Sequence, residues 1–184
     1  MRILGIDPGL GRVGFGLLEI TSGRHKNTGL ASEPASSGFG PCEWGLIATS
    51  KDKPAGARLQ EIFHDITAVL EHTRPDVISI ERLFYFRNAT TLVPVAQARG
   101  VILMVVDQFN LPVYEYTPMQ VKQAVTGSGK AKKGEIQDIL VTLLGLDRKP
   151  TPDDAADALA LAVCYYNHMG QFSLQSASET ISQG

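Results

Sequence analysis

Apolar residues near the start of the chain are arranged as in buried strands. Residues 2–6 form a largely apolar run that ends at Asp7, where a proline and a glycine predict a turn. Residues 13–20 alternate small and large apolar side chains, which predicts a second strand in a hairpin with the first. A third strand is expected at 42–49, within a segment, 21–56, that is rich in Ser, Gly and Pro.

Helical periodicity appears after residue 57. Apolar side chains recur there at i, i+3, i+4 and i+7, which predicts an amphipathic helix that ends before Pro75. These side chains are Leu59, Ile62, Phe63, Ile66, Val69 and Leu70. A strand is expected at 77–80, with Glu81 at its end, and then a helix at 88–107. One side of that second helix carries Leu92, Val95, Arg99, Leu103 and Val106.

The second half of the chain continues this alternation of strands and helices. Thr117 and Gln120 flank a proline in the arrangement of a capping box, so a helix is expected to begin there, after a strand at 113–116. A loop rich in Gly and Lys, 126–132, follows that helix. The last two helices are expected at 136–144 and from 151 to about 168.

The order of these elements predicts the fold class. A hairpin of strands followed by alternating helices and strands is typical of an α/β fold, with a mixed sheet flanked by helices. The chain has 184 residues, and roughly 100–200 residues are usual for one domain. We therefore expect a single domain over 1–169, with 21–56 as a long surface excursion and 170–184 as a polar, disordered tail.

Charge and cysteine usage narrow the picture only slightly. The net charge of −2 alone indicates an ordinary solvated surface, although the stretch from Arg82 to Lys133 is locally basic and suits phosphate binding. Cys42 and Cys164 supply neither a disulfide framework nor metal-ligand spacing. No apolar run is long enough to cross a bilayer. A cytoplasmic protein with no membrane contact is the expectation.

Four acidic side chains occupy positions that are expected to be buried, where a charged carboxylate is unfavourable. Asp7 and Glu81 each end an apolar strand, and Asp154 and Asp157 lie one turn apart in an alanine-rich helix that can approach the sheet closely. Four buried carboxylates would repel one another unless divalent cations neutralised them. Oxygen ligands suit Mg²⁺ or Mn²⁺, and two such ions ~3.5–4 Å apart would support phosphodiester hydrolysis.

Each acid also has an ordinary structural interpretation. Asp7 could open an Asx-turn, Glu81 could pair with an arginine, and Asp154 could cap the last helix. Asp157 is harder to explain in this way, because it lies one turn further into the helix. Only the joint pattern of the four acids favours a metal site over these interpretations.

Five motifs, in this order, make the chain resemble the RuvC family of Holliday-junction resolvases. They span residues 1 to about 168 and comprise Ile3–Gly9 with Gly14 and Gly16, Ile80–Phe84 with Asn88, Gln97–Gly100, Gln120–Gln123 with Gly127 and Gly129, and Asp154–Ala160. The resemblance implies a ribonuclease-H-like fold and a homodimer that nicks four-way DNA junctions symmetrically in recombination and repair, giving 5′-phosphate ends. It also implies a Mg²⁺ requirement and cooperation with the RuvA–RuvB branch-migration complex.

The resemblance further implies roles for single residues. Asp7, Glu81, Asp154 and Asp157 match the family's catalytic, metal-binding acids, with Asp153 as the neighbouring alternative to Asp154. Basic residues near the scissile phosphate are matched by Lys122 and Lys133, and Lys133 is expected to assist catalysis. Phe84 matches an aromatic residue at the junction centre, although ordinary core packing is its alternative. Further DNA contacts are expected at Arg82, Arg87, Lys130 and Lys132.

Two other functions compete with this hypothesis. Gly5–Gly9 with Gly14 and Gly16 also resembles the first phosphate loop of actin-like ATPases and sugar kinases. One lobe of this size leaves no obvious adenosine pocket, and Asp154–Asp157 would have no role there. A non-catalytic binder of branched DNA would lack at least one of the four acids, all of which are present.

Overall fold

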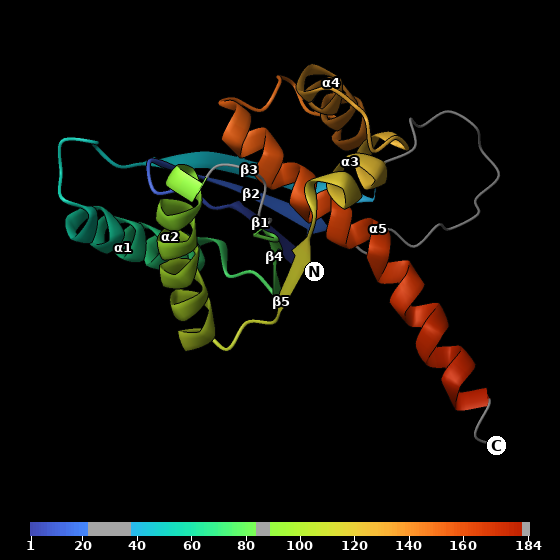
Figure 1. Cartoon of the computed structure of the whole chain (residues 1–184). Coiled ribbons are helices and arrows are strands. Elements are labelled where there is room, and N and C mark those ends of the chain that lie inside the picture. Colours follow the sequence, from blue (N-terminus) through green and yellow to red (C-terminus); the bar gives the residue numbers. More distant parts are fainter. Residues whose placement is uncertain (22–37, 84–88, 182–184) are drawn as a thin grey trace.

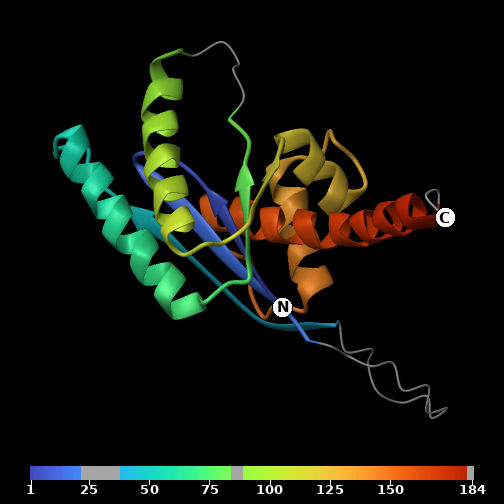
Figure 2. The same cartoon turned by 90° about the horizontal axis from the view of Figure 1, so that it is seen from below.

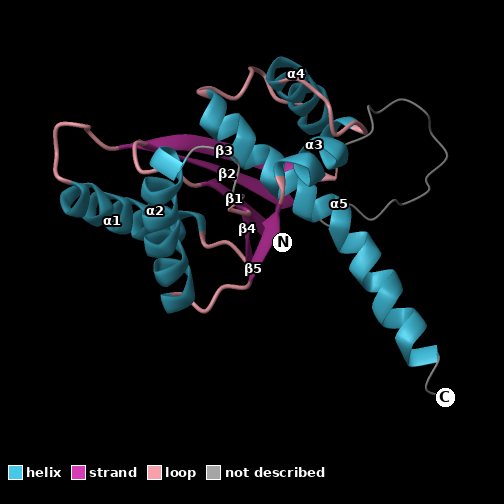
Figure 3. Ribbon diagram, in the orientation of Figure 1, coloured by secondary structure: helices cyan, strands magenta, loops and turns pink. Residues whose placement is uncertain are grey.

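The computed structural model describes residues 1–21, 38–83 and 89–181. Within these residues, five strands form one mixed sheet with helices on both faces (Figures 1 and 3). The strands are β1 (Arg2–Asp7), β2 (Arg12–Ile20), β3 (Phe39–Ala48), β4 (Val77–Glu81) and β5 (Val113–Tyr116). The helices are α1 (Ala55–Thr73), α2 (Ala89–Gln108), α3 (Pro118–Thr126), α4 (Lys133–Leu144) and α5 (Asp153–Ile181). The predicted α/β fold with a mixed sheet is confirmed.

The strand order is β3-β2-β1-β4-β5. β1, β2 and β3 pair antiparallel, as the predicted hairpin requires, whereas β4 pairs parallel with both β1 and β5. Helices α1 and α2 cover one face of the sheet, and α3, α4 and α5 cover the other (Figure 2). Each face carries its own cluster of buried apolar side chains.

Successive residues of β1 alternate between these two faces. Ile3 belongs to the cluster beneath α5, and Leu4 and Ile6 belong to the cluster beneath α1 and α2. This alternation is the ordinary period of two of a strand, so Gly5 and Asp7 also face α5. The parity of the first strand therefore directs its terminal carboxylate towards the last helix of the chain.

Helix α5 lies against the sheet with backbone close to backbone. A Cβ atom on Gly5 would stand 1.8 Å from the carbonyl oxygen of Ala158, and one on Gly14 would stand 2.0 Å from that of Asp154. From the next strand, the Ser79 hydroxyl donates a buried hydrogen bond of 2.7 Å to the carbonyl oxygen of Leu161. The close approach expected from the alanines of α5 is confirmed, and it needs glycine on the facing strands.

Two elements, β3 and α5, differ in extent from the sequence prediction. The third strand begins at Phe39 and includes Pro41, which is tolerated because β3 is an edge strand. Most of 38–56 is thus strand and turn, while 22–37 lie outside the described residues. The last helix, expected to end near residue 168, continues to Ile181 through the segment predicted to be disordered. No proline interrupts that segment, and a polar composition alone does not stop a helix.

The side of α2 singled out in the sequence is not the side that is buried, although one of its residues, Val106, is buried. The side chains buried against the sheet and α1 are Ala98, Ile102, Val105 and Val106, whereas Leu92, Val95, Arg99 and Leu103 are only partly buried. This helix is apolar on nearly every side, so the sequence contains little information about its orientation.

Within the described part of the chain, no helix combines the length and apolar character needed to cross a membrane.

Replacing Gly5 by alanine tests the backbone contact between β1 and α5. The added methyl group has no space, so we expect Gly5→Ala to lower the free energy of unfolding by about 1–3 kcal/mol. Urea denaturation measures this change. Gly56→Ala is the matched control, because a Cβ atom there meets nothing within 4 Å, and it should leave stability unchanged or slightly raised. Equal stability of the two variants would contradict the close contact.

Candidate active site

Two of the predicted acids lie side by side at the ends of parallel strands. On β4, Val77 and Ser79 face α5, and Glu81 faces the same side because alternate residues of a strand share one face of the sheet. β1 and β4 are paired up to Ile6 and Ile80, and the next residues in this register are Asp7 and Glu81. Because neighbouring strands are about 4.8 Å apart, the two carboxylates stand close together on the α5 side of the sheet.

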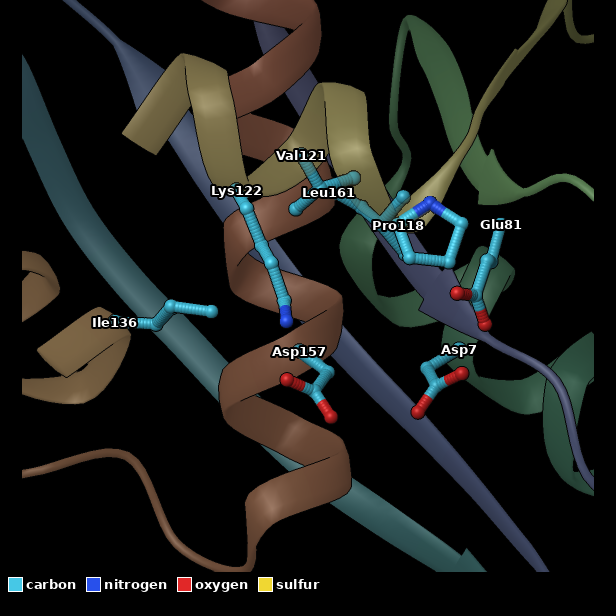
Figure 4. Close-up of a pocket in the computed structure, with 8 residues that line it drawn as sticks. All are labelled: Asp7, Glu81, Pro118, Val121, Lys122, Ile136, Asp157 and Leu161. Carbon is cyan, nitrogen blue, oxygen red and sulfur yellow. The ribbon is translucent and has the colours of Figure 1, made fainter. Parts of the chain in front are cut away.

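Helix α5 brings a third acid to the same place. Between residues 155 and 165, Asp157 is the one residue that is not buried. Its carboxylate faces a cavity of about 360 Å³ that Asp7 and Glu81 also line (Figure 4). The remaining lining residues are Pro118, Val121, Lys122, Ile136 and Leu161. Three acids from three distant segments of the chain therefore share one cavity with mostly apolar walls.

Lys122 is the basic residue of this cavity. It extends from α3 towards Asp157 (Figure 4). The start of α3 is fixed by the predicted capping box. The backbone N–H of Gln120 donates to the Thr117 hydroxyl at 3.2 Å, and the backbone N–H of Thr117 donates to the side-chain oxygen of Gln120 at 2.9 Å. Helix α3 thus holds the ammonium group of Lys122 beside the carboxylates, and this positive charge offsets part of their mutual repulsion.

Asp154 is placed differently from the other three acids. Its Oδ2 atom accepts a hydrogen bond of 2.8 Å from the Nε atom of Arg12, and it does not line the cavity. Its neighbour Asp153 accepts a hydrogen bond of 3.1 Å from Gln137 of α4. Asp153 therefore points towards α4 and Asp154 towards β2, which favours Asp154 as the fourth acid.

The donor set suits a hard divalent cation. Carboxylate oxygens are the ligands that Mg²⁺ and Mn²⁺ prefer, and the three cavity acids supply them. In the described residues, no three acidic, His or Cys side chains already converge on one point. The three carboxylates are instead spread around the cavity, and Asp154 lies one helical turn before Asp157 on α5.

The cysteines take no part in this site. Burial raises the pKa of the Cys164 thiol to about 12 and that of Cys42 to about 11. Both thiols are therefore protonated at neutral pH and are poor nucleophiles and metal ligands. This agrees with the absence of metal-ligand spacing between them in the sequence.

The other predicted DNA-contact residues are dispersed. Arg82 forms an ion pair of 3.6 Å with Glu115, which also binds Arg99. Lys130 and Lys132 are exposed on the loop between α3 and α4. Lys133 begins α4, but its side chain is outside what the structure describes, as are Phe84 and Arg87 altogether.

Sequence reasoning missed two residues that shape the site. Arg12 pairs with Asp154, and Gln123 braces the lysine-bearing loop: its amide donates to the Gly127 carbonyl oxygen at 2.8 Å and accepts from the Gly129 amide at 3.0 Å. Arg12 has the same strand parity as Gly14, a signal that could have placed it on the α5 side. No comparable signal marks Gln123, because its role depends on the loop conformation.

Comparison with known proteins identifies the family to which the chain belongs. The family model described as "Crossover junction endodeoxyribonuclease RuvC" matches residues 3–165. RuvC of Petrotoga mobilis is 45% identical, with 94% of this chain and 97% of the relative covered. RuvC of Brevibacillus brevis is 46% identical, with 90% and 91% covered. The structure of T. thermophilus RuvC "in complex with Holliday junction substrate" is 32% identical, with a TM-score of 0.78 and 92% and 96% covered. The chain belongs to the RuvC family, and its fold is the ribonuclease-H-like fold of that family.

Proposed function

We propose that the chain is a metal-dependent endonuclease that resolves four-way DNA junctions by paired, symmetric nicks. The observation that carries this proposal is the gathering of Asp7, Glu81 and Asp157 around one cavity, in a member of a family of crossover junction endodeoxyribonucleases. The similarity to a relative described with Holliday junction substrate supports the same substrate here. Such an enzyme works in recombination and repair, in the cytoplasm with the chromosomal DNA.

The acids have the role of holding cations against the DNA backbone. Asp7, Glu81, Asp154 and Asp157 would together hold two Mg²⁺ ions, for which Mn²⁺ can substitute. When bound, these ions activate water and neutralise charge during phosphodiester hydrolysis, with 5′-phosphate and 3′-hydroxyl ends as products. Without cations, three carboxylates would repel any phosphate, which disfavours the alternative of a phosphate loop for ATP.

The lysines have the complementary role. Lys122 lies beside the acids, so its ammonium group can stabilise charge that develops on the scissile phosphate. Lys133 is proposed for the same task from the start of α4. Lys130 and Lys132 on the adjacent exposed loop would bind flanking phosphates, and Arg82, Phe84 and Arg87 are proposed as contacts nearer the junction centre.

A homodimer would match the two-fold symmetry of the junction. Support for it comes from α2, whose solvent side exposes Val93 to 59% and Met104 to 50%. Gln97 and Gly100 lie between them on the same side, and a Cβ atom on Gly100 would meet nothing within 4 Å. This stripe of one polar and three small or apolar residues suits the close approach of a second α2 helix. The RuvA–RuvB complex is the proposed partner in branch migration.

Junction cleavage tests the proposed function directly. A synthetic four-way junction and a linear duplex of the same sequence are incubated with Mg²⁺ or EDTA, and the products are resolved on a denaturing gel. We expect paired, Mg²⁺-dependent nicks in the junction alone. Asp7→Asn should lower the nicking rate by orders of magnitude while junction binding persists, because the substitution removes a cation ligand without changing the basic surface.

The control for this loss is Asp107→Asn, which removes an exposed carboxylate from α2, a helix that packs on the other face of the sheet from the cavity. It should nick junctions at the wild-type rate. Equal cutting of the duplex would identify a general nuclease instead of a resolvase. Retained cleavage by Asp7→Asn would refute the assignment of Asp7.

The dimer surface can be tested by placing a charge on the stripe of α2. We expect Met104→Glu to convert a dimer into a monomer, because two such helices would bring buried like charges together. Sedimentation velocity measures the oligomeric state over a range of concentrations. Met119→Glu is the control: Met119 is even more exposed, at 69%, but lies on α3. Dissociation by both substitutions, or by neither, would contradict an interface through α2.

A further inference from the structure

Arg12 lies at the edge of the acidic site, at a position set by the strand period. It begins β2 and has the same parity as Gly14, so it lies on the α5 side of the sheet. Gly14 is the cross-strand partner of Asp7, which makes Arg12 the diagonal neighbour of Asp7 on the same face. A permanent positive charge therefore stands beside the carboxylates that are proposed to bind cations.

The fold also brings this charge to the start of α5. Because Gly14 contacts the carbonyl oxygen of Asp154, the first turn of α5 lies directly over the beginning of β2. The Arg12 Nε atom donates a hydrogen bond of 2.8 Å to Asp154 Oδ2. The two side chains are 51% and 30% exposed, so water screens the pair and its stabilisation is small. Asp154 is thus held outside the cavity lining by a weak contact.

We propose that Arg12 is a positioning residue that holds Asp154 outside the cavity when no cation is bound and yields it when a divalent cation binds. The proposal rests on the proposed function, because it takes Asp154 as a cation ligand. Arg12 and the cation then compete for one carboxylate. Once released, the guanidinium group is available to a DNA phosphate, whose oxygens match its planar fork of N–H donors.

This exchange has an electrostatic reason. With Asp154 paired to Arg12, the metal-free site has to tolerate repulsion among three cavity acids instead of four. Arg12 moves from a carboxylate to a phosphate, so its charge stays paired in both states. Cation binding and tight DNA binding are thereby coupled through a single side chain.

Cation binding without DNA tests the competition. Mn²⁺ is titrated into the full chain and followed by electron paramagnetic resonance for the wild type, Arg12→Ala, Asp154→Asn and the double variant. We expect Arg12→Ala to tighten Mn²⁺ binding roughly two- to fivefold, the range of an exposed ion pair. Asp154→Asn should weaken it, and in that background Arg12→Ala should have no further effect.

Arg58→Ala is the matched control for loss of a nearby positive charge. Arg58 lies on α1 close to the turn before β2, but its Nε atom donates to the Thr49 hydroxyl at 2.9 Å instead of a carboxylate. Its removal should leave Mn²⁺ affinity unchanged. Arg12→Lys should behave much like the wild type towards Mn²⁺, because it keeps a cation beside Asp154.

Junction binding supplies the second measurement. The salt dependence of the dissociation constant is compared for wild type and Arg12→Ala, in EDTA and in Ca²⁺. We expect equal slopes in EDTA, where Arg12 is occupied by Asp154. In Ca²⁺ the slope for Arg12→Ala should be smaller by about one, because one phosphate contact is lost.

Several outcomes would overturn the exchange. These are unchanged or weaker Mn²⁺ binding by Arg12→Ala, an equal effect of Arg58→Ala, or an Arg12→Ala effect that persists in Asp154→Asn. The Mn²⁺ titration needs neither DNA nor nicking. Junction nicking by the wild type with a negative titration would therefore refute only the role of Arg12, whereas a positive titration without nicking would refute only the proposed function.

Discussion

The direct contact between the backbone of α5 and the first two strands is the constraint on which the rest of the structure depends. Gly5 and Gly14 remove the side chains that would otherwise separate the helix from the sheet. Ser79 adds a buried hydrogen bond from β4 to the same helix. Because α3 and α4 pack in turn on α5, the position of this helix sets the depth of the cavity and the place of Lys122.

The close packing of α5 on the sheet also concentrates acidic side chains around one cavity, and the fold offsets their charge with basic side chains. Lys122 extends from α3 towards Asp157, and Arg12 binds Asp154 one turn earlier on α5. On the edge strand β5, Glu115 forms ion pairs with Arg82 and Arg99. Part of the basic middle of the chain is therefore used in ion pairs within the fold. The remaining lysines, on the loop after α3, are left exposed to solvent. An acidic cavity and a basic surface therefore coexist within a chain of nearly neutral charge.

Local patterns predicted those features that depend on short-range geometry. The ends of two apolar runs located Asp7 and Glu81 at strand ends, helical spacing identified α1, and the capping box at Thr117 located the start of α3. Features that depend on tertiary contacts were not predicted. The buried side of α2 could not be predicted, because a helix that is apolar on nearly every side has no preferred face. The pairing of Arg12 with Asp154 joins residues 142 positions apart, which no local pattern reveals.

The long separation along the chain between the acids also affects the order in which the site forms during synthesis and folding. Asp7 and Glu81 are synthesised early, but their cavity gains Asp157 and its covering helix only when the last part of the domain emerges from the ribosome. Contacts between the first strand and the last helix are among the most non-local that a chain of this length can form, so they are expected to form late in folding. A nascent chain therefore has no complete set of acids. The topology itself delays DNA-cutting capacity until translation of the domain is finished.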